Sequence, residues 1–162
     1  MEIRDATAED WPAIWGFMQG IVEAGETFSW DRDINPEVAQ ARWFPPPPGR
    51  TVVAVDDEGR VVGTAVSGPN HGGPARHVST ASFMVDPGRG GGGIGRALGT
   101  HVLEQARRDG FRAMQFNAVV ETNAPAVALW KSLGFRVLTT VPEAFDHPKH
   151  GYVGLHIMFF RF

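Results

Sequence analysis

The sequence predicts an α/β (α+β) domain in which helices cover the faces of a mixed β-sheet. The chain has 162 residues, the length of one domain rather than two, and we expect residues 1–162 to form it. Its β-rich and helical segments follow the order β-α-α-β-β-β-α-β-α-β-β. Consecutive β segments favour hairpins and β-α-β segments favour parallel crossovers, so one sheet should contain both strand directions.

The first strand is expected to end at Arg4, and the first helix follows it. Thr7 and Asp10 have the spacing of a capping box, which satisfies free amides where a helix begins. Gly25 is a typical helix terminator. Between these signals, apolar residues recur every three or four positions, so one helical stripe should face the core. They are Trp11, Ile14, Met18 and Ile21.

Proline and glycine divide the next part of the chain. A second helix is expected over 36–44, because proline suits a first helical turn and the proline run 45–48 ends the helix. The β-rich runs 51–55 and 60–66 flank an acidic turn that ends in glycine, which predicts a hairpin. A loop rich in glycine and proline then leads to a third long strand over 76–85.

The second half of the chain alternates helices with strands. A helix that ends at Gly110 is followed by a strand over 113–119 and a helix over 123–133. The last two strands are expected over 135–141 and 152–162. The final run is apolar on both alternating faces. It therefore lies either in the middle of the sheet or against a second subunit, in a homodimer.

Composition limits the classes of function. The formal charge of −3 argues against a partner held mainly through phosphates, such as nucleic acid or an anionic membrane. With no cysteine, the chain has no disulfide, thiolate ligand or thiol nucleophile. The first residues lack the regions of a signal peptide, and no stretch reaches the roughly 20 apolar residues of a membrane span, so we expect a cytoplasmic protein. Its basic residues are almost all arginine, which is typical of a GC-rich bacterial genome.

The glycine run Gly88–Gly95 is the strongest functional signal, because it joins a strong strand to an amphipathic helix. Helix N-termini carry unpaired N–H groups and partial positive charge, which attract phosphate. Glycine lets the backbone approach an anion and adopts the positive φ angles of an anion-binding nest. A flexible connection is the alternative, but short βα loops rarely need so many glycines. We therefore predict a phosphate-binding loop.

Two common phosphate loops fit this run poorly. A P-loop requires Gly-Lys-Ser/Thr, whereas Gly95 is followed by Arg96 and Ala97. A dinucleotide-binding fingerprint matches formally at Gly90, Gly92 and Gly95. However, the run lies in mid-chain, and the acidic residue expected about 20 positions later is missing. A nucleotide-phosphate enzyme remains an alternative.

Two motifs, in this order, resemble the GNAT superfamily of N-acetyltransferases. Residues 85–87 (Val-Asp-Pro), the glycine run and residues 93–98 (Gly-Ile-Gly-Arg-Ala-Leu) resemble its acyl-CoA loop, Arg/Gln-x-x-Gly-x-Gly/Ala. Residues 123–135 are similar to its block Asn-x-x-Ala-x-x-Leu-Tyr-x-x-x-Gly-Phe. The resemblance implies a mixed, mostly antiparallel sheet of about seven strands, splayed between the fourth and fifth and flanked by about four helices.

The resemblance also implies acetyl-CoA as co-substrate, with no metal. Its pyrophosphate would lie on the glycine-loop amides and its pantetheine arm between the splayed strands. In two places the chain departs from the family pattern. The motif arginine stands one residue early, at Arg89, so its role in closing the loop is open. The family's frequent tyrosine acid aligns with Trp130, which has no titratable hydroxyl. The residues implied to bind acetyl-CoA are Phe83, Met84, Val85, Arg89, Gly90, Gly91, Gly92, Gly93, Ile94, Gly95, Arg96, Asn123, Ala126 and Trp130.

Acetyl transfer to an amine needs a neutral nucleophile, an oxyanion donor and a leaving thiolate. A backbone N–H near Phe83 or Val85 could be the donor. Glu26 is our first choice for a water-assisted base and His150 the second, although a solvated loop residue is the ordinary alternative for each. The candidate catalytic residues are Glu26, Asn117, His150 and Tyr152, the only tyrosine. The candidate acceptor-binding residues are Phe28, Trp30, Ser82 and Phe145.

The reaction predicted is transfer of acetyl from acetyl-CoA to the amine of a small molecule, such as an amino acid or an analogue. Because Trp130 replaces the tyrosine, a non-catalytic CoA-binding regulatory domain is the main alternative. We expect no zinc site from His147, His150 and His156, since zinc takes three or four ligands and no acid completes the set.

Overall fold

The computed structural model describes residues 1–162 and has the predicted order of helices and strands. Three short 3-10 turns, at Ala8–Asp10, Gly73–Ala75 and Pro87–Arg89, complete the chain. The strands and helices, in order, are β1 (Glu2–Asp5), α1 (Trp11–Ala24), α2 (Pro36–Trp43), β2 (Arg50–Val55), β3 (Val61–Pro69), β4 (Val78–Val85), α3 (Ile94–Arg108), β5 (Ala113–Val120), α4 (Ala124–Ser132), β6 (Arg136–His147) and β7 (Gly151–Arg161).

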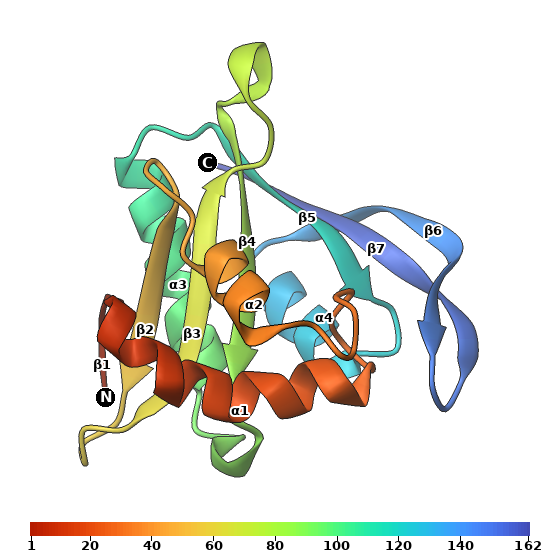
Figure 1. Ribbon diagram of the computed structural model, residues 1–162. Helices are drawn as coiled ribbons and strands as arrows, with labels where there is room; N and C mark the ends of the chain where they lie inside the picture. Colours follow the sequence, from red (N-terminus) through yellow and green to blue (C-terminus); the bar gives the residue numbers. More distant parts are fainter.

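All strands belong to one sheet, in the order β1-β2-β3-β4-β5-β7-β6. Every neighbouring pair is antiparallel except β4 and β5, which are parallel. Helices α1 and α2 lie on one face of the sheet and α3 and α4 on the other (Figure 1). The mixed, mostly antiparallel seven-stranded sheet with four helices is therefore confirmed. Strand β7 lies between β5 and β6, one strand in from the edge, so it is paired on both sides, as the first of the two predicted alternatives requires.

Successive side chains of β4 point to opposite faces of the sheet, so this strand contributes to the hydrophobic core on each face. Met84 packs with the buried stripe of α1 on one face, whereas Phe83 and Val85 pack against the core beneath α3 and α4. The predicted stripe of α1 is buried at Trp11, Ile14 and Met18 and half-buried at Ile21. None of the helices combines the length and apolarity needed to cross a membrane.

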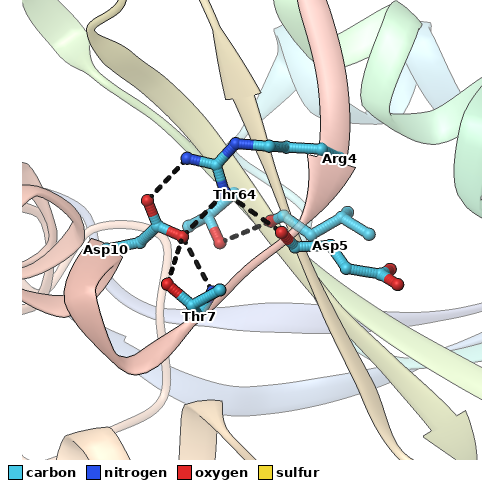
Figure 2. A network of polar contacts seen from close by, with 6 residues as sticks. Arg4, Asp5, Thr7, Asp10 and Thr64 are labelled. Atoms are coloured by element: carbon cyan, nitrogen blue, oxygen red, sulfur yellow. Dashed lines mark hydrogen bonds and ion pairs between the residues drawn. The ribbon is translucent and has the colours of Figure 1, made fainter.

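A polar network fixes the start of α1 (Figure 2). Arg4 donates two hydrogen bonds to the carboxylate of Asp10, at 2.9 and 2.8 Å. The Thr7 amide donates to the same carboxylate at 2.8 Å, so the predicted capping box is confirmed. Asp10 is buried, and the hydrogen bonds from Arg4 are the main reason that its pKa lies below the ordinary value.

The segment 142–152, predicted as a connecting loop, instead forms the turn end of a long hairpin. Strand β6 continues to His147, and its residues 145–147 pair with Gly151–Val153 of β7. A bulge between Val141 and Phe145 accommodates Pro142, which an edge strand tolerates. Cross-strand pairing with β7 therefore overrides the local turn signals in this segment.

Candidate functional site

Strands β4 and β5 form a wedge that is closed at one end and open at the other (Figure 1). They pair only where Val78 faces Ala113 and Ser79 faces Met114. Beyond this point, β5 carries a bulge between Phe116 and Val119. The predicted splay between the fourth and fifth strands is therefore confirmed.

The edge of β4 that faces the wedge has free backbone groups. The His77 carbonyl accepts from Arg112 ahead of β5, whereas the Val78 carbonyl accepts from Asn70 beside β3. Because successive residues of a strand alternate sides, the N–H and C=O groups of Phe83 and Val85 point toward β5. They lie beyond the last paired residues, so they are free to bind a ligand as an added strand would.

A cavity of about 900 Å³ fills the open wedge. Its walls come from β4, β5, the glycine loop, the first turns of α3 and α4, and the segment between α1 and α2. Arg89 and Gly92 do not line it. The predicted acetyl-CoA residues that do line it are Phe83, Met84, Val85, Gly90, Gly91, Gly93, Ile94, Gly95, Arg96, Asn123, Ala126 and Trp130.

The glycine loop presents a row of unpaired amides to this cavity. Gly91 and Gly93 have φ angles of 87° and 73°, a left-handed conformation that favours glycine. The first amide of α3 with an intramolecular partner is that of Ala97, which donates to the Gly93 carbonyl at 3.0 Å. None of the amides from Gly90 to Arg96 donates to a protein acceptor. They form an anion-binding nest at the positive end of a helix.

Trp130 spans the gap between the diverging strands. Its buried ring lies 4.7 Å from the ring of Phe83 on β4 and 4.9 Å from that of Phe116 on β5. These contacts fill one face of the wedge with aromatic side chains, so the strands stay apart without a hole in the core. The indole of Trp130 therefore has a packing role at the position where the family pattern has a tyrosine.

An aromatic corner forms the other side of the cavity. Phe28 and Trp30 line the cavity with their rings at 88° and their centroids 5.1 Å apart. Both rings pack on Trp43, whose indole N–H donates to the buried hydroxyl of Thr64 at 2.9 Å. Ser82 lines the same cavity. Three of the four predicted acceptor-binding residues therefore come together there.

Asn117 lies in the bulge of β5 and lines the cavity. Its amide nitrogen donates to Asn70 Oδ1 at 2.7 Å, and its carbonyl oxygen accepts from Gln115 Nε2 at 3.0 Å. These bonds fix the orientation of the Asn117 amide. Gln115 and Asn70 were not among the predicted site residues. The period-two spacing of Gln115 and Asn117 on one strand face was a usable signal, whereas Asn70, 47 residues away, offered none.

The other candidate catalytic residues lie outside this cavity. The Glu26 carboxylate lines a separate hollow of about 250 Å³ and pairs with Lys149 Nζ at 2.8 Å. The hydrogen bond from Lys149 is the main reason that the pKa of Glu26 lies below its ordinary value. His150 packs its ring 4.6 Å from that of His147, and the side chain of Tyr152 is exposed.

Phe145, the fourth predicted acceptor-binding residue, does not reach the cavity. It is buried with Val120 and Val153 in a small apolar cluster. The reason is the extension of β6, which pairs Phe145 with Val153 instead of leaving it on a loop. Nowhere do three or more His, Asp or Glu side chains converge in a way that could hold a metal ion.

The cavity wall carries little charge. Its only charged side chain is Arg96, at the glycine-loop end, and the guanidinium of Arg96 donates to Ser132 Oγ at 2.8 Å. The polar groups of the aromatic end are the hydroxyls of Thr27, Ser29, Thr80 and Ser82 and the amide of Asn117. One end is therefore suited to a phosphate, and the other is uncharged.

Comparisons with known proteins agree with this geometry. The model of the "Acetyltransferase (GNAT) family" matches residues 4–135. An N-acetyltransferase of Schizosaccharomyces pombe is 31% identical over 118 residues, which cover 72% of this chain. The match spans only 56% of that curated relative, a little over half its length.

Two solved structures are similar over almost the whole chain. A GCN5-related N-acetyltransferase from Kribbella flavida is 55% identical, with a TM-score of 0.97, over 99% of this chain and 97% of that one. The protein yncA from Salmonella typhimurium, solved with its cofactor acetyl-CoA, is 26% identical, with a TM-score of 0.84, over 99% of this chain and 92% of that one.

Proposed function

This chain belongs to the GNAT family of acetyltransferases, and on that basis we propose that it transfers acetyl from acetyl-CoA to the amine of a small molecule. The family model and the likeness to the Kribbella flavida protein confirm the predicted family, that of acyl-CoA-dependent N-acetyltransferases. The observation that carries the proposal is the cavity in the open wedge, which runs from unpaired glycine amides to an uncharged aromatic corner.

The residues at the loop end fit acetyl-CoA. Free amides from Gly91 to Arg96 would hold its pyrophosphate, because they have no protein acceptor and lie at the positive end of α3. Free backbone groups of Phe83 and Val85 would hold the pantetheine arm, and Asn123 lies within reach at the start of α4. The likeness to yncA, which was solved with acetyl-CoA, supports this assignment.

Acetyl transfer from a thioester can proceed with little help from acidic or basic side chains. When bound, acetyl-CoA supplies a thioester, and a backbone N–H of Phe83 or Val85 would stabilise the oxyanion that forms on attack. A thiol with a pKa of about 8.5 leaves readily as thiolate. The packing role of Trp130 is therefore compatible with turnover. Glu26 and His150 stay predictions as bases, and each would act only through water, because neither lines the cavity.

Asn117, Ser82, Phe28 and Trp30 are proposed to contact the acceptor, because they gather at the end of the cavity away from the glycine loop. The acceptor class suggested by the sequence is a small-molecule amine, of which amino acids and their analogues are examples. The formal charge of −3 and the uncharged aromatic end favour a small molecule over a nucleic acid or a membrane.

The proposal is tested in two stages. Acetyl-CoA at saturating concentration should raise the melting temperature of the purified protein by several degrees, whereas NADH and ATP should not. Amines should then accelerate release of free CoA thiol, with an N-acetylated product by mass spectrometry. If acetyl-CoA binds tightly in calorimetry but no amine in a broad panel is acetylated, the non-catalytic CoA-binding domain is the correct function.

A further inference from the structure

The acceptor end of the cavity offers neither a carboxylate to an ammonium nor a cation to a carboxylate. Its wall is made of aromatic rings, hydroxyls and the Asn117 amide. The charged wall residue, Arg96, belongs to the loop end and donates to Ser132. An ionised acceptor would therefore meet no opposite charge at this end to offset the hydration that it gives up on binding.

Four charged or titratable groups on the segments beside the aromatic corner contact other protein groups. Glu26 and Lys149 pair with each other at 2.8 Å. His150 packs against His147, whose Nδ1 accepts from the amides of Lys149 and His150. The guanidinium of Arg42 lies over the ring of Trp30 at 5.7 Å, and Arg42 does not line the cavity. No Asp, Glu, His or Lys side chain therefore lines the cavity, where it could take a proton directly from an ammonium.

The aromatic corner is rigid enough to select a shape. Phe28 and Trp30 meet nearly at right angles, and both rest on Trp43. Trp43 is fully buried and fixed by its hydrogen bond to Thr64. A flat apolar body in this corner would contact two rings whose positions are already set, so little side-chain entropy is lost on binding.

Asn117 adds a directed donor. One hydrogen of its amide nitrogen is used by Asn70, and its oxygen accepts from Gln115. The second amide hydrogen is left for a neutral acceptor such as a carbonyl oxygen. The nearby hydroxyl of Ser82 can accept from the N–H of an amine.

Resting on the proposed function, we infer that the acceptor is a weakly basic amine on an uncharged, aromatic body, and that it binds as the free base. Its nitrogen forms a bond to the acyl carbon of the thioester and the carbon–sulfur bond breaks. The proton released from nitrogen ends on the sulfur, which gives the amide and free CoA thiol. No protein base is required, because the ammonium loses one proton to solvent before the free base binds, and the second proton, released during acetyl transfer, is the one that ends on the sulfur.

Phenylalanine amide, phenylalanine and phenethylamine test this inference, because they share a ring and differ beside the amine. An amine next to an amide has a pKa of about 8, against about 10 for an alkylamine, so at pH 7 its neutral fraction is roughly a hundred times larger. We expect kcat/KM at pH 7 to be at least about 50-fold higher for the amide than for phenethylamine. Phenylalanine, with its carboxylate, should be the poorest of the three acceptors.

The pH profile separates binding of the free base from catalysis by a protein base. We expect kcat/KM to rise with pH and to level off near the pKa of each acceptor, so that the profile shifts when the acceptor is changed. A profile with one midpoint for all acceptors, or a preference for phenylalanine, would overturn the inference. Absence of acetylation with every amine of the broad panel would instead contradict the proposed function.

A matched pair of variants tests the uncharged wall directly. Ser82→Asp places a carboxylate at the acceptor end, and Ser82→Asn is its uncharged control. We expect Ser82→Asp to raise the ratio of kcat/KM for phenethylamine over phenylalanine amide at least about tenfold, and Ser82→Asn to leave it within about twofold. An equal ratio in the two variants, with the acetyl-CoA thermal shift retained in both, would refute the inference.

Discussion

Two helix starts in this protein treat the same backbone groups in opposite ways. At the 3-10 turn Ala8–Asp10, which leads directly into α1, Thr7 and Asp10 close a capping box, and Arg4 neutralises the carboxylate (Figure 2). At the start of α3, Gly93 has no side-chain cap, and the amides from Gly90 to Arg96 have no protein acceptor. Every helix begins with amides that its own turns cannot satisfy. The first site uses them for stability, whereas the second leaves them for a ligand.

The two shorter helices also have side-chain caps, so α3 is the exception. Asn35 accepts from two amides at the start of α2, and Asn123 accepts from the Ala126 amide at the start of α4. Glycine at the start of α3 therefore provides no side-chain cap, which costs stability, and it leaves the backbone amides accessible to a ligand. Substitutions at capped and uncapped starts should separate stability from acetyl-CoA binding.

The largest effect is expected from Gly93→Val. Its φ of 73° is strained for a β-branched residue, so the loop amides should turn away from their common target. Loss of two charge-assisted hydrogen bonds would weaken acetyl-CoA binding about 100-fold, measured by calorimetry. Gly59→Val is the control, because Gly59 has a φ of 80° and open space in a distant turn. Gly59→Val should lower the free energy of unfolding about as much as Gly93→Val does, because both glycines have a positive φ. It should leave acetyl-CoA binding unchanged.

Asp10→Asn should show the reverse pattern. We expect the free energy of unfolding to fall by about 1–2 kcal/mol, because Arg4 loses a charged partner, with no change in acetyl-CoA affinity. Since the pKa of Asp10 is depressed by folding, its contribution is complete above about pH 4 and is lost as the pH falls through the folded value. Denaturant unfolding at pH 7 and pH 3 should therefore show a gap between variant and parent that narrows at the lower pH.

Gly92→Asp should make the start of α3 resemble that of α1. Gly92 does not line the cavity, and an added Cβ would meet no atom closer than 3.9 Å, so the change introduces charge without crowding. The carboxylate would repel the diphosphate, and we expect acetyl-CoA affinity to fall about tenfold at low salt and less at high salt. Gly92→Asn, which has the same shape without the charge, should bind nearly as well as the parent. Equal losses in both would show that the loop does not hold an anion.

The smallest effect is expected at the two asparagine caps. Asn35→Ala and Asn123→Ala should each lower stability by about 1 kcal/mol, since each removes an N-cap. Only Asn123→Ala should also raise the KM for acetyl-CoA, about threefold, because Asn123 lines the cavity and Asn35 does not. A KM that rises equally in both variants would mean that the cap at Asn123 acts only through stability.

Short-range sequence patterns predicted the helix starts and the glycine loop that these experiments alter. The capping box at Thr7, the stripe of α1 and the glycine loop could be read from residues within a few positions of one another, because helix periods and caps are short-range properties. Phe83 and Val85 were predicted differently, because the resemblance to the family implies that the end of the strand before the loop binds the pantetheine arm. The segment around Phe145 was predicted wrongly, since its structure depends on pairing with Val153 of another strand.

The sequence by itself determined the order of the helices and strands, the helix starts, and the backbone freedom of the loop before α3. Only the tertiary structure decided how far β4 and β5 diverge, that Trp130 packs between Phe83 and Phe116, and that Asn70 orients Asn117 from 47 residues away. It also paired Glu26 with Lys149, outside the cavity. The physical reason is the range of the interactions. Propensities and caps act between near neighbours, whereas the walls of the site depend on strand register and packing between distant segments.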